Sequence, residues 1–502
     1  MVTRKDKPMN YISTRGIDKD GVSSAYAIKT GLAKDGGLYM PESIPTISED
    51  EIKELATLPY TKRAAYVLSK FLTDYTYDEL LADAEAAYSE AKFGDHPAPV
   101  SDLGEGVYML ELWHGPTSAF KDMALQIMPR LFVRALRKCD EKRCAMILVA
   151  TSGDTGKAAL EGYRDVPGTK IKVFYPVDGV SRVQKLQMQT QEGENVSVSG
   201  IVGNFDDAQT GVKRIFADEE IKAKLNSEGV FLSSANSINW GRLVPQIVYY
   251  VSAYCDMVSS GAIKLGEKID VCVPTGNFGN IFACYVAKLM GLPVERLVCA
   301  SNKNNVLTDF FKTGVYDRNR TFHATMSPSM DILISSNLER LLFVTLGAEK
   351  TRAYMASLNE CGRYELSAED LALISESFVG YFTTEEQTSE TIARTYKNKN
   401  CLIDTHTAVA IHATEAYMTD YKAERKTVAV STASAYKFAR DVYRSLTDSD
   451  ADGDLEALEA LHNFTNVDIP TPLASILKKE IRHTGTIDKS EMENATLAFA
   501  RD

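Results

Sequence analysis

The sequence lacks the features that would place the protein in a membrane, on a nucleic acid or in the secretory pathway. None of its 502 residues falls in an uninterrupted apolar run of about 18, so no membrane-spanning helix is expected. Residues 1–10 are charged and lack the apolar core of a signal peptide. The net charge of −12 argues against a nucleic-acid or anionic-membrane partner.

Cysteine pairs and repeats are also missing. The eight cysteines form no C-x-x-C pair, and several lie in apolar runs. Reduced, buried thiols in a cytoplasmic protein are therefore the simplest interpretation. There is no internal repeat and no low-complexity linker. What remains is a globular composition, 44% hydrophobic and 25% charged, long enough for two or three domains.

Apolar runs typical of buried strands alternate with helical patterns along most of the chain. The strand candidates are residues 145–150, 170–175, 269–273 and 427–431, and the helical patterns are residues 157–164, 209–218, 243–257 and 281–290. This alternation predicts an α/β protein with mostly parallel sheets wound with helices.

The chain divides into three expected parts. Residues 1–98 are predicted to form a small N-terminal α+β domain, with a strand and turn at 11–16 and helices that open on capping boxes at Ser48 and Thr76. Residues 99–150 and 226–502 are assigned to a large domain. Residues 151–225 hold one compact set of alternating elements and are predicted to form an inserted small lobe.

Lys121 is the most informative residue of the chain. It follows a Gly-Pro turn and Phe120, and it precedes apolar residues at helical spacing. An amine partly desolvated at the start of a helix has a lowered pKa, and a neutral amine forms a Schiff base with an aldehyde. An ordinary surface lysine is the alternative.

The motif GNFGN at residues 276–280 follows a strand and opens a helix. Consecutive free N–H groups at a helix start favour an anion, which suggests a phosphate cradle. The two glycines are expected because a Cβ would crowd the phosphate or because the turn needs a positive φ. A tight strand–helix turn without a ligand is the alternative.

Two further polar turns follow predicted strands. The first, TSGDTG at residues 151–156, offers hydroxyl and N–H groups for a carboxylate, or else only caps the next helix. The second is STAS at residues 431–434. Ligands of open parallel sheets lie beyond the carboxyl ends of the strands. A lysine for an aldehyde, a cradle for a phosphate and a hydroxyl for a ring nitrogen together indicate pyridoxal phosphate.

The chain resembles the threonine synthases that carry an N-terminal domain ahead of a pyridoxal-phosphate fold. The resemblance spans nearly the whole chain and rests on YISTRG at 11–16, HGPTSAFKD at 114–122, SGDTG at 152–156, GNFGN at 276–280 and DTHTA at 404–408. One departure is Ala435-Tyr436 after Ser434, where relatives often have a proline. The resemblance implies fold type II of the pyridoxal-phosphate enzymes, like the β subunit of tryptophan synthase.

It also implies an activity and roles for residues. The substrate would be O-phospho-L-homoserine, converted with water to L-threonine and phosphate. Lys121 would carry the cofactor and act as base, and Thr432 would face the pyridine nitrogen. The cofactor phosphate would bind to the backbone of Gly276, Asn277, Phe278, Gly279 and Asn280.

For the substrate, the residues themselves suggest candidates. Ser152, Asp154 and Thr155 are placed at the amino-acid end, with an orienting role for Asp154 because a carboxylate repels a carboxylate. The turn with Asn239 and Arg242 precedes a helix, and Arg242 is the first choice for a bidentate clamp on the substrate phosphate. Lys185 is the second choice. Either cation could instead be a solvated surface group.

Two other motifs have alternatives that carry no chemistry. His406 could act as a base, but it precedes an apolar helix, which favours a packed or capping histidine. Residues 448–459 fit the EF-hand pattern, but no second loop exists, and an acidic turn that caps a helix is preferred. No metal site is predicted.

Rival functions remain open at this point. A phospho-lyase acting on the same substrate but releasing a keto acid would share every motif, and a non-catalytic relative would bind rather than react.

A monomer or a small homo-oligomer is expected.

Overall fold

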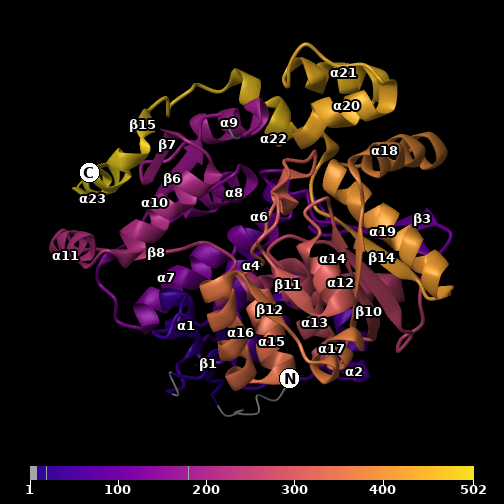
Figure 1. The fold of residues 1–502 in the computed structure, drawn as a ribbon, viewed down its shortest axis with the longest axis horizontal. Helices are drawn as coiled ribbons and strands as arrows, with labels where there is room; N and C mark the ends of the chain where they lie inside the picture. Colours follow the sequence, from indigo (N-terminus) through magenta and orange to yellow (C-terminus); the bar gives the residue numbers. More distant parts are fainter. Residues whose placement is uncertain (1–7, 18–19, 179, 502) are drawn as a thin grey trace.

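Two mostly parallel sheets form the frame of the protein and confirm the predicted α/β class (Figure 1). The computed structural model describes residues 8–17, 20–178 and 180–501. Most of the segment 1–10, in which no signal peptide was expected, lies outside the described residues. The strands of the larger sheet are β3 (Val100–Gly104), β4 (Val107–Glu111), β9 (Ile269–Pro274), β10 (Val294–Ser301), β13 (Phe378–Phe382) and β14 (Thr427–Ser431). Their order is β13-β10-β9-β14-β4-β3, and the β3–β4 pair is antiparallel.

The smaller sheet is parallel throughout. Its strands are β5 (Cys144–Ala150), β6 (Thr169–Pro176), β7 (Val196–Val202), β8 (Val230–Ser233) and β15 (Thr486–Asp488), in the order β15-β7-β6-β5-β8. Two short antiparallel pairs complete the strands, β1 (Tyr11–Ser13) with β2 (Tyr39–Pro41) and β11 (Val315–Asp317) with β12 (Arg363–Glu365).

Helices cover both sheets. The N-terminal helices are α1 (Ser24–Thr30), α2 (Glu49–Leu55), α3 (Tyr60–Phe71), α4 (Tyr77–Ala87) and α5 (Glu90–Phe93). Those around the smaller sheet are α7 (Met128–Lys138), α8 (Asp154–Tyr163), α9 (Arg182–Gln189), α10 (Phe205–Ala217), α11 (Glu219–Ser227) and α23 (Met492–Arg501). The remaining helices are α6 (Lys121–Leu125), α12 (Trp240–Ser259), α13 (Gly279–Leu289), α14 (Val306–Thr313), α15 (Leu338–Leu346), α16 (Ala348–Cys361), α17 (Ala368–Ser375), α18 (Glu385–Lys399), α19 (Thr405–Tyr421), α20 (Ala439–Thr447), α21 (Glu456–Thr465) and α22 (Thr471–Ala474).

The apolar runs became buried strands because helices cover both of their faces. All six residues of β9 and all five of β14 are buried, as are the central five of β5. Such strands contribute strongly to the hydrophobic stabilisation, since their side chains leave water almost completely. Among the helices within the described ranges, none has the length and apolar character needed to cross a bilayer.

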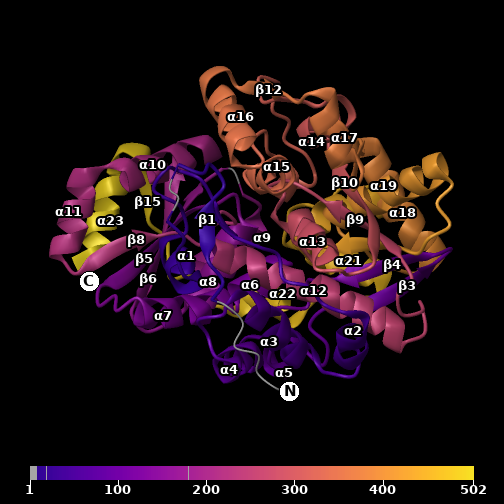
Figure 2. The same cartoon turned by 90° about the horizontal axis from the view of Figure 1, so that it is seen from below.

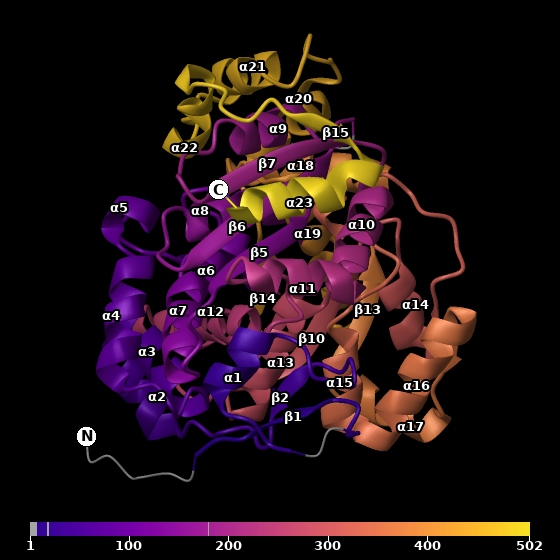
Figure 3. The same ribbon diagram turned by 90° about the vertical axis from the view of Figure 1, so that its left-hand side faces the viewer.

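The small lobe extends beyond the segment 151–225 that the sequence suggested. The prediction assigned β5 to the large domain, but β5 pairs with β6 and β8 in the middle of the smaller sheet. Residues near the C-terminus join the lobe as well, because β15 pairs with β7 and α23 lies across the sheet beside α10 (Figure 3). Pairing of distant strands, which apolar runs do not reveal, sets the extent of this lobe.

The N-terminal segment is predominantly helical, with α2 to α5 gathered beneath α12 (Figure 2). Both predicted capping boxes are present, with Ser48 paired to Glu51 and Thr76 paired to Glu79. The predicted strand at residues 11–16 is β1, which pairs with β2. Arg63 of α3 ties this segment to α12 through an ion pair of 2.6 Å with Asp256.

The order of the strands brings the predicted polar turns together. β9, β14 and β4 are neighbours in the larger sheet and run parallel, so the segments that follow them leave the same edge. Those segments carry the glycine loop, Thr432 and Lys121. The turn after β5 approaches from the smaller sheet, which places the candidate site between the two sheets.

Candidate active site

Lys121 is the first residue of α6, as predicted, and it is buried. Its Nζ lies 3.6 Å from a carboxylate oxygen of Asp154 and donates a hydrogen bond of 3.4 Å to the hydroxyl of Ser329. The ring centre of Phe120 is 5.0 Å away. Burial lowers the pKa of Lys121 to about 8, against the opposing charge of Asp154. The amine therefore has an appreciable neutral fraction near neutral pH.

A second buried lysine, Lys437, shares Asp154 with Lys121. No pattern in the sequence predicted a role for it. Its Nζ lies 2.8 Å from the carboxylate of Asp154 and donates to the carbonyl of Thr117 at 2.9 Å. Gln184 also donates to Asp154, at 3.0 Å. Burial by itself would raise the pKa of Asp154, but the charges of Lys437 and Lys121 lower it overall. The carboxylate of Asp154 is thus an ionised bridge between two lysines.

The glycine loop, residues 276–280, joins β9 to α13 as predicted. The positive φ of this loop, 63°, belongs to Phe278 and not to Gly276 or Gly279, so the expectation of a glycine in the left-handed region is wrong. The buried ring of Phe278 packs on Phe311 and Phe378, which fixes this backbone conformation.

The two glycines are favoured by close approach to neighbouring protein atoms, backbone at Gly276 and a side chain at Gly279. A Cβ on Gly276 would lie 3.1 Å from the carbonyl oxygen of Ser329, and one on Gly279 would lie 3.3 Å from Nδ2 of Asn337. Both contacts are tighter than ordinary van der Waals packing, so a larger residue would displace the loop from its neighbours.

The loop fits a phosphate group. Within the described part of the chain, the backbone N–H groups of Gly276, Asn277 and Phe278 donate to no protein acceptor. Asn280 accepts hydrogen bonds from the hydroxyls of Tyr249 and Tyr250, and its buried Nδ2 has no partner among the described residues. Buried donors without acceptors are costly, and several of them at one helix start indicate an anionic ligand.

Thr432 lies directly beside the lysine segment. Its carbonyl accepts a hydrogen bond of 2.8 Å from the N–H of Phe120, and the N–H of Ser434 donates to Ser118 at 3.1 Å. Thr432 is buried, and its hydroxyl has no hydrogen-bond partner among the residues that the structure describes. The strands therefore bring the predicted lysine, loop and threonine to one edge of the sheet.

The turn after β5 contains two hydroxyl groups, on Ser152 and Thr155, that make no hydrogen bond to a described residue. The helix that follows is capped by the hydroxyl of Thr151, which accepts from the N–H groups of Gly153 and Gly156 at 3.0 and 2.8 Å. Both Ser152 and Thr155 are half-buried, and neither hydroxyl has a protein partner within the described ranges. The helix capping that was the alternative role of this motif is thus performed by its first residue, Thr151.

Arg242 is a buried cation without an anionic partner. It lies in the first turn of α12 and donates one hydrogen bond of 2.8 Å, to the carbonyl of Ala235. No carboxylate among the described residues pairs with it, and burial lowers its pKa to about 10. Its charge lowers the pKa of Lys121, which places the two cations in one electrostatic environment. An arginine in this state is suited to bind an external anion.

The other two predicted substrate residues differ from Arg242. Asn239 is the N-cap of α12: its Oδ1 accepts from the N–H of Gly241 and its Nδ2 donates to the carbonyl of Ile28, both at 2.8 Å. Its amide is therefore occupied by the backbone and is not available to a substrate. Lys185 is half-buried in α9, and no ion pair joins it to any described residue.

His406 is a packed histidine, as preferred from the sequence. Its Nδ1 lies 2.7 Å from the carboxylate of Asp404, and its Nε2 accepts a hydrogen bond of 3.1 Å from the N–H of Ser329. His406 thus holds the backbone of the residue whose hydroxyl contacts both Lys121 and Asp154. Ser329 had no sequence signal, because its neighbours in the fold are distant in the chain.

The EF-hand-like segment forms no cation cage. Asp448 ends α20, and Asp450 makes a bidentate ion pair with Arg440, with both hydrogen bonds at 2.8 Å. The part of the chain that the structure describes contains no group of three or more acidic, histidine or cysteine residues that could hold a metal.

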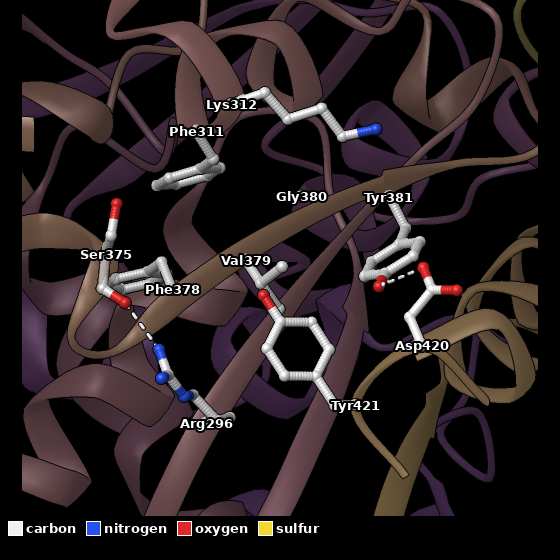
Figure 4. A pocket seen from close by; sticks show the side chains of 10 residues that line it. All are labelled: Arg296, Phe311, Lys312, Ser375, Phe378, Val379, Gly380, Tyr381, Asp420 and Tyr421. Atoms are coloured by element: carbon white, nitrogen blue, oxygen red, sulfur yellow. Dashed lines mark hydrogen bonds between the residues drawn. The ribbon is translucent and has the colours of Figure 1, made fainter. Parts of the chain in front are cut away.

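A surface pocket elsewhere contains none of the predicted site residues. Figure 4 shows it at the outer strand β13, with Arg296 and Lys312 on either side of Tyr381 and Tyr421. Arg296 donates to the carbonyl of Ser375, so its charge is partly engaged. Lys121 and Lys437, by contrast, are buried in the interior of the protein.

Comparison with known proteins agrees with this geometry. Residues 10–88 match the family described as threonine synthase N terminus, and residues 95–433 match the family of pyridoxal-phosphate-dependent enzymes. The threonine synthase of Saccharomyces cerevisiae is 33% identical over 515 residues, with 97% of each chain covered. The crystal structure of a threonine synthase from Brucella melitensis superposes with a TM-score of 0.86 at 33% identity, covering 98% of this chain and 100% of that one.

A human relative named threonine synthase-like 1 is 42% identical over 422 residues, which are 80% of this chain and 56% of that protein. The chain therefore spans little more than half the length of this relative. The two family matches together cover most of the chain, and the yeast relative is similar from end to end. The chain belongs to the threonine synthase family of pyridoxal-phosphate-dependent enzymes.

Proposed function

We propose that the protein converts O-phospho-L-homoserine and water to L-threonine and phosphate. The observation that carries the proposal is the buried amine of Lys121, with a pKa lowered to about 8, beside a loop of free N–H donors and an unpaired arginine. The Brucella relative is described as bound to pyridoxal phosphate, which supports the same cofactor here.

The residues that would hold the cofactor are Lys121, the glycine loop and Thr432. Lys121 would bind its aldehyde carbon covalently, and the N–H groups of residues 276–280 with Nδ2 of Asn280 would bind its phosphate. The free hydroxyl of Thr432 would face the ring nitrogen. When bound, pyridoxal phosphate supplies an electron sink for a carbanion at the substrate Cα.

Lys121 is the base of the proposed reaction. With the cofactor bound, the amine of Lys121 would take the proton from Cα of the substrate and would move a proton at Cβ. Asp154 and Ser329 lie within 3.6 Å of Nζ and would hold the amine in place between these two transfers. Lys437 keeps Asp154 ionised, so that Asp154 does not compete for the proton.

The two ends of the substrate would be held by different groups. Arg242 would clamp the phosphate that leaves from Cγ, because it is buried and no anion among the described residues neutralises it. The hydroxyls of Ser152 and Thr155, both free, would hold the carboxylate at the amino-acid end. The eight free cysteines support a reducing compartment, and we place the enzyme in the cytoplasm.

The test is to incubate the cofactor-loaded protein with O-phospho-L-homoserine and to identify the products. Threonine and phosphate in equal amounts are expected, and borohydride should fix the cofactor on the peptide that contains Lys121. Lys121→Ala should reduce turnover by at least about 100-fold, since a general base is lost. A keto acid in place of threonine would indicate a phospho-lyase, and normal turnover by Lys121→Ala would refute the proposal.

A further inference from the structure

The motif at residues 11–16 has no part in the chemistry above, yet it contacts the large domain closely. Within it, the hydroxyl of Thr14 donates to Glu339 at 2.6 Å, and the guanidinium of Arg15 donates two bonds to the same carboxylate at 3.0 and 3.1 Å. Glu339 is 5% exposed and lies in the first turn of α15. A buried carboxylate with three such donors has a fixed position.

The start of α15 packs directly against the glycine loop. Two residues before Glu339, Asn337 donates from its backbone N–H and from Nδ2 to the carbonyl of Asn277, at 3.1 and 3.0 Å. Nδ2 also donates to the hydroxyl of Ser237 at 3.0 Å, and it is the atom nearest to the position of a Cβ on Gly279. The position of Asn337 therefore determines where the middle of the loop lies.

Arg340 joins the start of α15 to the N-terminal domain a second time. It is fully buried and donates to Oδ1 of Asn337, to the carbonyl of Ser237 at 3.1 Å and to the carbonyl of Tyr39 in β2 at 3.3 Å. Glu339 and Arg340 thus connect β1 and β2 of the N-terminal domain to the residues that contact the loop.

We propose that Thr14 and Arg15 are positioning residues for the glycine loop and act through Glu339 and Asn337. The N-terminal domain would then set the affinity of the loop for the phosphate of the cofactor, without touching it. This inference rests on the proposed role of the loop as the phosphate site.

The chain offers a matched control. Arg134 and Asp83 form another bidentate pair between the N-terminal helices and the rest of the protein, with hydrogen bonds of 2.6 and 3.0 Å. The side chains of that pair are 25% and 7% exposed, against 23% and 6% for Arg15 and Glu339. The two pairs are similar in burial and in their bidentate geometry, although Arg134 also lies 3.5 Å from Glu79, and only one of the pairs leads to the glycine loop.

The experiment compares Glu339→Gln with Asp83→Asn in the full chain, with Arg15→Gln as a variant that alters a more exposed residue. The dissociation constant of pyridoxal phosphate is measured by titrating cofactor-free protein, and thermal unfolding of the same protein is measured in parallel. Both carboxylate variants should lower the unfolding temperature, but only Glu339→Gln and Arg15→Gln should weaken cofactor binding, by about ten-fold. The double variant of residues 15 and 339 should be no weaker than the single ones.

Equal cofactor binding by Glu339→Gln, Arg15→Gln and Asp83→Asn would overturn the inference. Gly279→Val and Phe278→Leu separate it from the proposed function. If the loop binds the phosphate, Gly279→Val loses the cofactor on dialysis and Phe278→Leu, which keeps the backbone N–H, retains it. If Gly279→Val also retains the cofactor, the phosphate lies elsewhere and both proposals fail; if only Glu339→Gln and Arg15→Gln are unaffected, the inference alone fails.

Discussion

Lys437 and Arg242 are both buried cations close to Lys121, but the protein treats their charges differently. Lys437 has the carboxylate of Asp154 at 2.8 Å and two further hydrogen bonds from its amine. Among the described residues, the guanidinium of Arg242 has one hydrogen bond, to a carbonyl. A buried charge is costly unless it is paired, so the fold neutralises one cation itself and leaves the other for a ligand. The difference distinguishes a charge that serves the structure from one that serves binding.

The largest expected effect tests the paired cation. Asp154→Asn leaves Lys437 buried without a counter-charge, and the free energy of unfolding should fall by about 3–5 kcal/mol. Urea denaturation of the cofactor-free protein measures it. Glu415→Gln, which breaks the exposed ion pair with Arg394, is the control and should cost less than about 1 kcal/mol. Equal losses would mean that the Asp154 pair is not a structural charge.

The unpaired cation should respond in the opposite way. Arg242→Gln removes a charge that no protein group compensates, so the free energy of unfolding should change by less than about 1 kcal/mol. The KM for the phosphorylated substrate should rise about 100-fold, or ~2.7 kcal/mol, because a bidentate clamp is lost. Lys185→Gln should leave KM nearly unchanged. A large loss of stability with an unchanged KM would reverse the comparison.

Thr432, unlike Lys437 and Arg242, would offer the cofactor an uncharged group, its hydroxyl. Its hydroxyl cannot protonate the ring nitrogen, whereas Thr432→Asp should do so and favour abortive transamination. Threonine formation should slow by about ten-fold, equivalent to ~1.4 kcal/mol of barrier. The rate and the ratio of products are the measurements. If neither changes, Thr432 does not face the ring nitrogen.

The smallest effect concerns the pH dependence of the lysine itself. Burial lowers the pKa of Lys121 to about 8, so cofactor-free protein should capture pyridoxal phosphate faster as pH rises, with a midpoint near pH 8. Arg242 lowers this pKa and Asp154 raises it. The midpoint should therefore move to higher pH in Arg242→Gln and to lower pH in Asp154→Asn, as followed by the change in absorbance on capture. Shifts in the same direction would contradict the assigned charges.

The parts of the site that the sequence predicted are those carried by local patterns. The strand-turn-helix pattern around residues 276–280 and the helix start at Lys121 depend on neighbouring residues, and both are confirmed. Lys437 could not be found in this way, because its partner Asp154 is distant in the chain, at the start of α8, and nothing near residue 437 marks it as buried. A positive φ was one of two alternative reasons expected for the glycines, but it belongs to Phe278, whose ring packs on two aromatic rings. The bond from Asn239 to the carbonyl of Ile28 was not predicted either, because Ile28 is distant in the chain.

The large sequence separation between the paired strands β7 and β15 has a consequence for biosynthesis. β7 ends at Val202, and the strand that covers its open edge, β15, begins at Thr486. A ribosome adds roughly 5–20 residues per second, so the edge of β7 waits on the order of 15–60 s for its partner. During that time β7 presents unpaired backbone groups, and the face later covered by α23 stays open to solvent. The nascent small lobe therefore stays incomplete until the end of the chain has been made.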